Sequence, residues 1–207
     1  MLIPSSAEPL LLSLSVAFTE PTGQRFLALL IAAVLTTGRR TVSNLFRTGR
    51  TLMPGDLSTY HRVLSKRRWS TLALSRILAA SILKHFVPDG PVCLAGDDTV
   101  EEHRGKKVYG KGCHRDAVRS THSFTAYRWG HKWVVLAILV KFPWAARPWA
   151  LPVLVALYHP KDWNLKHGRR HKTPVVLMRQ MLALLLHWFP DRAYCSKIRP
   201  HQAARRW

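Results

Sequence analysis

Five of the eleven acidic residues fall between positions 97 and 116, and this cluster is the clearest candidate for chemistry. Asp97 and Asp98 directly follow VCLAG, an apolar run that predicts a short buried strand. Carboxylates at the end of such a strand need a cation or hydrogen-bond donors to offset their desolvation. A divalent ion such as Mg²⁺ prefers hard oxygen ligands and promotes phosphodiester cleavage. The other acids of the cluster are Glu101, Glu102 and Asp116.

Basic residues surround these acids, and they allow a second interpretation. The cluster could be a solvated turn whose acids pair with Arg104, Lys106 and Lys107. A further basic set, 166–172, precedes a predicted helix whose N-terminal N–H groups would add to the attraction for phosphate. An acidic metal pocket ringed by cations is what cleavage of a polyanion requires, whereas charged loops alone usually indicate a solvated surface.

The overall composition narrows the classes of protein. The chain has 32 Lys and Arg against 11 Asp and Glu, a formal net charge of +21, which favours nucleic acid as a partner and an anionic membrane surface second. The 47% hydrophobic content excludes a disordered basic tail. The longest uninterrupted apolar run, WVVLAILV, is too short for a bilayer span, so we expect no membrane insertion.

Cysteine and histidine usage argues against two further classes of protein. Cys93, Cys113 and Cys195 are far apart and form no CxxC pair, so we expect free thiols in a reducing cytoplasm and no cysteine zinc site. His167 and His171 lack the glutamate that a helical zinc motif requires.

The first part of the chain, 21–87, follows a lead-in at 1–20 and has a helical pattern. Apolar residues recur at three- and four-residue steps before Gly38, and TVSNLFRTG predicts a short second helix. With Arg39 and Arg40 beside it, this spacing is typical of a DNA-reading helix–turn–helix, and a plain helical bundle explains it equally well. Ser70 is the expected N-cap of a later helix.

The pattern changes after the breaker Pro88-Asp89-Gly90-Pro91. We expect strands at 92–96, 119–128 and 132–140, with a hairpin turn at Trp129-Gly130. A further strand at 149–158 would hold Pro152 at a sheet edge or a bulge. Thr173 caps a long helix that starts at Pro174, carries an apolar stripe from Val175 to Phe189 and stops at Pro190.

Most tryptophans are expected to be core residues. Those in apolar segments are Trp133, Trp144, Trp149 and Trp188, whereas Trp69 and Trp163 lie beside basic residues and are candidates for stacking on bases.

The segment GDDTVEEHRGKKVYGKGCHRDAVRS resembles the first catalytic block of bacterial insertion-sequence transposases of the DDE superfamily. The resemblance extends through YHRVLSKRRWS, GHKWVVLAIL, WALPVLVALY and GRRHKTPVVLMRQMLALLLHWFP, over roughly residues 20–190. It implies an α+β or α/β chain with a helical DNA-binding region at 21–87. An incomplete ribonuclease H-like core at 92–190, with three or four strands and one long helix, precedes a divergent tail at 191–207.

The resemblance also implies roles for individual residues. The D-x-T aspartate, the catalytic ligand of Mg²⁺ or Mn²⁺, maps to Asp97, and Asp98 at the variable position is a second candidate metal ligand. Lys106 and Lys107 match the basic pair that follows the first acid in the family. Together with the cations that spacing and charge single out, the candidate DNA-binding residues are Arg39, Arg40, Lys106, Lys107, Lys111, Arg169, Arg170 and Lys172.

The sequence departs from the family pattern beyond the long helix. The family has a strand ending in a second Asp and a later Glu, but Asp191 does not match the former and no Glu follows Glu102. We therefore expect a transposase fragment that binds metal weakly and neither cleaves nor joins DNA. The alternative is a non-catalytic DNA-binding remnant that competes with full-length transposase for element ends. Either protein would be cytoplasmic and associated with the nucleoid, with DNA and a second copy of the chain as partners.

Overall fold

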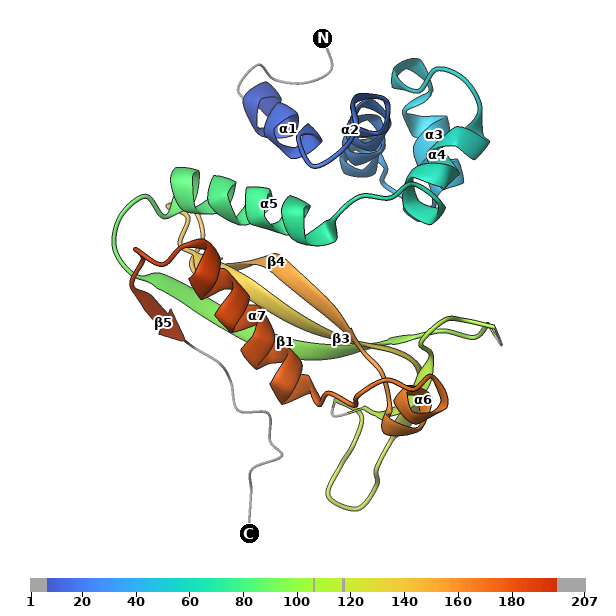
Figure 1. The fold of residues 1–207 in the computed structure, drawn as a ribbon, viewed down its shortest axis with the longest axis vertical. Helices are drawn as coiled ribbons and strands as arrows, with labels where there is room; N and C mark the ends of the chain where they lie inside the picture. The colour runs from blue at the N-terminus through green and yellow to red at the C-terminus, as the bar shows by residue number, and fades with distance from the viewer. Residues whose placement is uncertain (1–6, 106, 117, 197–207) are drawn as a thin grey trace. The chain divides into compact units, whose positions relative to one another are not determined.

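The computed structural model describes residues 7–105, 107–116 and 118–196, and it divides into two compact units, 1–81 and 82–207 (Figure 1). Helix α5 (Thr71–Phe86) continues across the boundary between them. The first unit contains the helices that precede α5, and the second contains the strands and the helices that follow it. No described helix is both long and apolar enough to cross a membrane.

The first unit is helical, as its sequence pattern predicts. It contains α1 (Glu8–Ser15), α2 (Glu20–Leu35), α3 (Val42–Thr48), a 3₁₀ turn (Arg50–Leu52) and α4 (Leu57–Ser65), so part of the predicted lead-in is helical. Its core includes Ala32, Met53 and Tyr60. Helix α3 ends at Gly49. A Cβ at this position would lie 2.9 Å from the Ala32 side chain of α2, so the glycine lets α2 and α3 pack closely. Helix α5 begins after Ser70, whose hydroxyl accepts the Ala73 N–H at 3.2 Å, which confirms the predicted cap.

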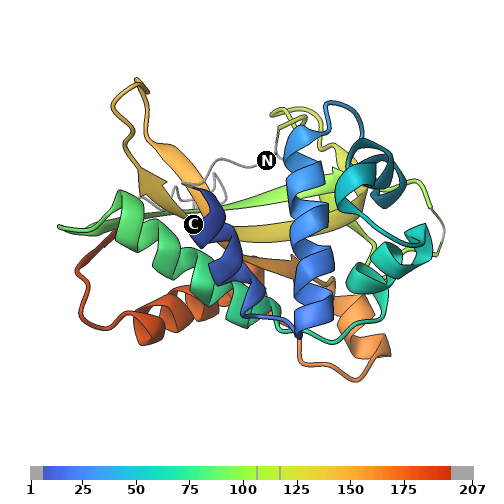
Figure 2. The same cartoon turned by 90° about the horizontal axis from the view of Figure 1, so that it is seen from above.

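The second unit contains a mixed sheet, so the chain is α+β. Its strands are β1 (Val92–Glu102), β2 (Gly112–Arg115), β3 (Tyr127–Val140), β4 (Trp149–Tyr158) and β5 (Tyr194–Ser196). The long strand β3 pairs antiparallel with β1, β2 and β4, and β5 pairs parallel with β1. Figures 1 and 2 show β1 and β3 as the long central strands of this sheet.

Two details of the predicted sheet are wrong. Residues 119–126 form no strand, and β3 runs without interruption through Trp129 and Gly130, where a hairpin turn was expected. Gly130 is paired with Glu102 on one side and Gly112 on the other, and a Cβ there would lie 1.9 Å from the Glu101 carbonyl oxygen. The glycine therefore permits a close approach of strands and marks no turn.

Strand β4 confirms the prediction for Pro152. The register of the β3–β4 pair shifts between Leu136 and Ala137, and Pro152 lies opposite Ala137 at this bulge. Among the described strands, β4 pairs with β3 alone, so the proline also lies on an edge strand, where a residue without an N–H is tolerated.

Helices α6 (Lys161–Lys166) and α7 (Pro174–Trp188) follow the sheet. Thr173 caps α7 as predicted, accepting the Val176 N–H at 3.3 Å. Helix α7 crosses one sheet face (Figure 1), where Met178 fills the space that a side chain at Gly96 would take. The buried residues of α7 are Met181 and Leu185, whereas Val175 is exposed, so the predicted stripe is correct only in part.

Strand β5 lies in the segment that was expected to be a divergent tail, and it brings the described strands to five. Its parallel pairing with β1 sets Cys195 opposite Cys93, and the two form a disulfide with Cα atoms 4.6 Å apart. The expectation of free thiols is therefore wrong for this pair. It rested on their separation of 102 residues along the chain, which the parallel pairing overcomes. Cys113 is free.

Candidate functional site

Asp97 lies on β1, paired in register with Val135 of β3. Its side chain is exposed, and its Oδ1 accepts the backbone N–H of Asp98 at 2.8 Å. The strand places this carboxylate within the sheet and beyond the point where β5 joins β1 at Val92–Leu94. An exposed carboxylate held on a strand is suited to binding a cation.

Asp98 points to the opposite face of the sheet, because successive side chains of a strand alternate. Its Oδ2 lies 3.0 Å from Nζ of Lys132, and both side chains are largely buried. The structure therefore does not bring the two predicted metal ligands together. Asp98 shares its face with Gly96 and the packing surface of α7, and Lys132 already supplies a countercharge to its carboxylate.

The remaining acids of the cluster do not join Asp97. Glu101 lies 3.7 Å from His103 Nε2 and accepts a hydrogen bond from Trp133 Nε1 at 3.4 Å. Within residues 7–105, 107–116 and 118–196, no group of three or more His, Cys, Asp or Glu side chains could hold a metal ion. Asp97 is therefore an exposed carboxylate without other acids beside it to complete a metal site among the described residues, and it lies at the position that the D-x-T pattern indicates.

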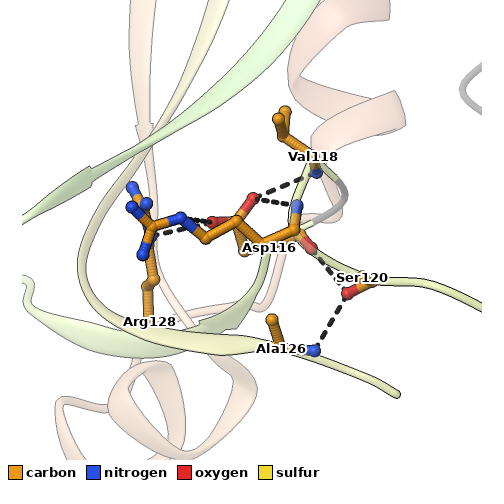
Figure 3. Close-up of polar contacts among 6 residues, drawn as sticks. Asp116, Val118, Ser120, Ala126 and Arg128 are labelled. Atoms are coloured by element: carbon orange, nitrogen blue, oxygen red, sulfur yellow. Dashed lines mark hydrogen bonds and ion pairs between the residues drawn. The ribbon is translucent and has the colours of Figure 1, made fainter. Parts of the chain in front are cut away.

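Asp116 has a structural role in the second unit. It is only 7% exposed, and its Oδ2 lies 2.7 Å from Nε of Arg128 on β3 (Figure 3). Its other oxygen accepts the Val118 N–H at 3.0 Å, while its backbone carbonyl accepts the Ser120 hydroxyl at 2.6 Å. These contacts fix the loop that connects β2 to β3 and offset the desolvation of the carboxylate. Asp116 is therefore an ion-paired acid, but its partner is Arg128 of β3 and not one of the basic residues 104–107 that the second interpretation named.

His114 is a buried polar residue of β2, and nothing in the sequence distinguishes it from its basic neighbours. Burial lowers the pKa of its imidazole, and the nearby Lys132 ammonium lowers that pKa further, while the carboxylate of Asp98 acts in the opposite direction. The ring is therefore neutral at pH 7. It packs edge-on against Tyr158, with ring centroids 5.7 Å apart. His114 and its neighbours Asp98, Lys132 and Tyr158 come from four different strands, so only the folded sheet brings them together.

Three predicted DNA-binding residues gather before α7. Arg169, Arg170 and Lys172 line a hollow of about 370 Å³ together with His159 and Asn164. Burial and then the Arg169 charge lower the pKa of His159, so positive charge in this hollow comes from the arginines and the lysine. Trp163 stacks between His159 and His167, which leaves its ring faces occupied by the protein.

The other predicted DNA-binding residues lie elsewhere. Lys111 donates to the Gly105 carbonyl at 2.9 Å, and Lys107 is exposed. Lys106 lies outside the described residues. Arg39 and Arg40 belong to the helical unit, where Nε of Arg40 donates to the Ala33 carbonyl at 2.8 Å near the end of α2.

The aromatic residues differ most from expectation. Trp144 and Trp149 are exposed rather than buried. Trp69, a candidate for stacking on bases, instead packs against Phe18 and Phe26 in the helical unit. An exposed row on β3 that includes Trp129 was not anticipated. The alternation of aromatic and other residues from Tyr127 to Trp133 was the available signal, but the expected turn at Trp129-Gly130 concealed it.

Comparison with known proteins adds an independent line of evidence. A family model described as DDE superfamily endonuclease matches residues 13–194, which covers most of both units. No match was found among curated proteins or among solved structures. The match includes the strand that carries Asp97 and the helix α7 that packs beneath it. The chain therefore belongs to the DDE superfamily endonuclease family.

Proposed function

We propose that this chain contributes the first metal-binding carboxylate, Asp97, of a transposase-type site that cleaves and transfers DNA strands at the ends of an insertion sequence. The observation that carries the proposal is the exposed position of Asp97 on β1, inside the segment that matches the endonuclease family. Endonucleases of this family generally depend on a divalent metal, and DNA is their substrate.

The order of elements supports a ribonuclease H-like core for residues 92–196. Strand β1 carries the first acid, β3 and β4 follow as an antiparallel pair, and α7 leads to β5, which lies parallel to β1. The family resemblance implies this same succession, with the second acid on the strand after the long helix. Short strand β2 is an addition within the connection between β1 and β3.

The residues present fit one part of a metal centre and not a complete one. Asp97 offers an exposed oxygen ligand, but Asp98 faces the opposite side and is paired with Lys132. Beyond Asp191 the 207-residue sequence contains no further Asp or Glu. A two-ion site needs several carboxylates to position both ions, so we infer that these 207 residues alone do not cleave DNA.

A second candidate function is non-catalytic DNA binding, and the net charge of +21 favours it. The arginines and lysine before α7 would still attract phosphate without any metal. Such a protein would compete with full-length transposase for the ends of the element or enter mixed oligomers with it.

A nicking assay on supercoiled DNA with Mg²⁺ or Mn²⁺ tests the proposal. We expect no nicking by the chain or by its Asp97→Asn variant, while both bind DNA. Adding a second protein segment that supplies the later Asp and Glu should restore cleavage to the original chain and not to Asp97→Asn. Asp98→Asn is the matched control, because it removes an adjacent carboxylate from the opposite face. Equal restored cleavage with Asp97→Asn would refute the role of Asp97, and metal-dependent nicking by the chain alone would refute its inactivity.

A further inference from the structure

The sheet face that carries Asp97 also carries a row of aromatic side chains from β3. Side chains alternate along a strand, so Tyr127, Trp129, His131 and Trp133 lie on one face. In the β1–β3 register Trp133 pairs with Thr99, which is two residues from Asp97 on the same face. Helix α7 packs against the other face, at Gly96.

Hydrogen bonds hold one end of the row, and the other end is open to solvent. The Trp133 indole donates to Glu101, and His131 Nε2 lies 2.6 Å from the Tyr109 carbonyl oxygen. At the far end, Trp129 is 61% exposed and Tyr127 is 66% exposed. Two large rings held this far open on a strand offer flat apolar surfaces to a partner.

Cations surround the exposed end of the row. A hollow of about 470 Å³ lies beside it, and its lining includes Tyr127, Trp129, Arg104, Lys111, Arg119 and Arg128. Asp116 pairs with Arg128 at 2.7 Å and approaches Arg119 at 4.0 Å, which neutralises part of this charge. Glu102 is an acid in the lining, but the lining remains net positive through Arg104 and Lys111. The ammonium of Lys111 lies 5.9 Å from the centre of the Trp129 ring.

We propose that this face binds a single-stranded segment of DNA, with unpaired bases stacked on Trp129 and its neighbours along β3. Phosphates would lie toward Arg104 and Lys111, and the strand would run toward Asp97. Exposed aromatic rings on a sheet bind unpaired bases, whose faces a duplex keeps stacked on one another. Side chains on one face of a strand are ~6.6 Å apart, which is about twice the spacing of successive bases in a stacked DNA strand. Bases that stack on successive rings of the row must therefore be more widely spaced than in a duplex, as an extended single strand allows.

The proposal depends on the proposed function only for DNA as the substrate and for the role of Asp97. Binding of labelled oligonucleotides to the full chain, measured by fluorescence anisotropy in EDTA, tests it without any metal. We expect Trp129→Ala to weaken single-strand binding about 5- to 150-fold, the range for loss of one stacked base. Duplex binding should change by less than about twofold, because it depends mainly on phosphate contacts.

Trp144→Ala is the matched control. Trp144 is 74% exposed, but it lies in the connection between β3 and β4 and stacks on Phe142. The Trp144→Ala substitution should therefore leave single-strand binding unchanged. Equal losses in the Trp129 and Trp144 variants, or equal losses for single strand and duplex, would overturn the proposal. Trp129→Phe keeps an aromatic face and should retain most of the affinity, which separates loss of stacking from loss of folding.

The positively charged end of the face has its own test. Arg104→Ala should lower the slope of log binding constant against log salt by about 0.7 for a single strand. An unchanged slope would contradict the placement of phosphate there. Because Asp97→Asn is not part of these measurements, the single-strand site can fail while the role of Asp97 stands, and the nicking experiment can fail while this site stands.

Discussion

At the scale of a single residue, the buried imidazole of His114 makes the stability of the sheet depend on pH. Its folded-state pKa is lowered, chiefly by burial, so the unfolded chain binds a proton more readily than the folded one. Stability linked to this group is therefore fully present above the ordinary histidine pKa of about 6.5 and is lost as pH falls from there through the folded-state pKa.

We expect His114→Phe to flatten the fall in stability below pH 6.5, measured by urea denaturation at a series of pH values. The substitution keeps a ring beside Tyr158 and removes the titrating nitrogens. His159, whose pKa is also lowered by burial, accounts for part of the remaining slope. If the variant and the original chain lose stability in parallel on acidification, His114 does not titrate as its surroundings require.

At the scale of elements, the disulfide between β1 and β5 closes a large loop. Cys93 and Cys195 are 102 residues apart, and a crosslink over such a distance restricts the unfolded chain strongly. We expect Cys195→Ser, or reduction, to lower the free energy of unfolding of the second unit by about 2–5 kcal/mol. Urea denaturation with and without reductant measures this. Cys113→Ser, which removes the free thiol, should have no such effect. Identical midpoints under the two conditions would show that β5 is held without the bond.

Signals within a few residues of each other predicted the ends of individual helices and the bulge well, but they did not predict which distant segments pair. The caps at Ser70 and Thr173 act within a few residues, so the sequence is sufficient to locate them. The bulge at Pro152 follows from the missing N–H of proline. By contrast, Gly130 resembles a turn residue until β1 and β2 are placed on either side of it. Only the same pairing reveals that Asp97 and the β3 aromatics share a face.

For the whole molecule, the net charge of +21 predicts DNA binding but does not locate it. If charge alone governed binding, any two exposed cations would contribute equally. If Arg169 and Arg170 form a phosphate site with Lys172, their removal should matter more than removal of other cations. We expect Arg169→Ala with Arg170→Ala to reduce the salt slope of duplex binding by about 1.8, or about 0.9 per lost contact.

The control that distinguishes these cases is Lys141→Ala with Arg147→Ala. Both of these residues are exposed in the connection between β3 and β4, and the double substitution removes the same charge from the same unit. It should leave the slope within about 0.3 of the original, because distant exposed charges are screened at physiological salt. Titrations at several salt concentrations give both slopes. Equal reductions would mean that DNA binding follows total charge, and the basic set before α7 would then be an ordinary solvated surface.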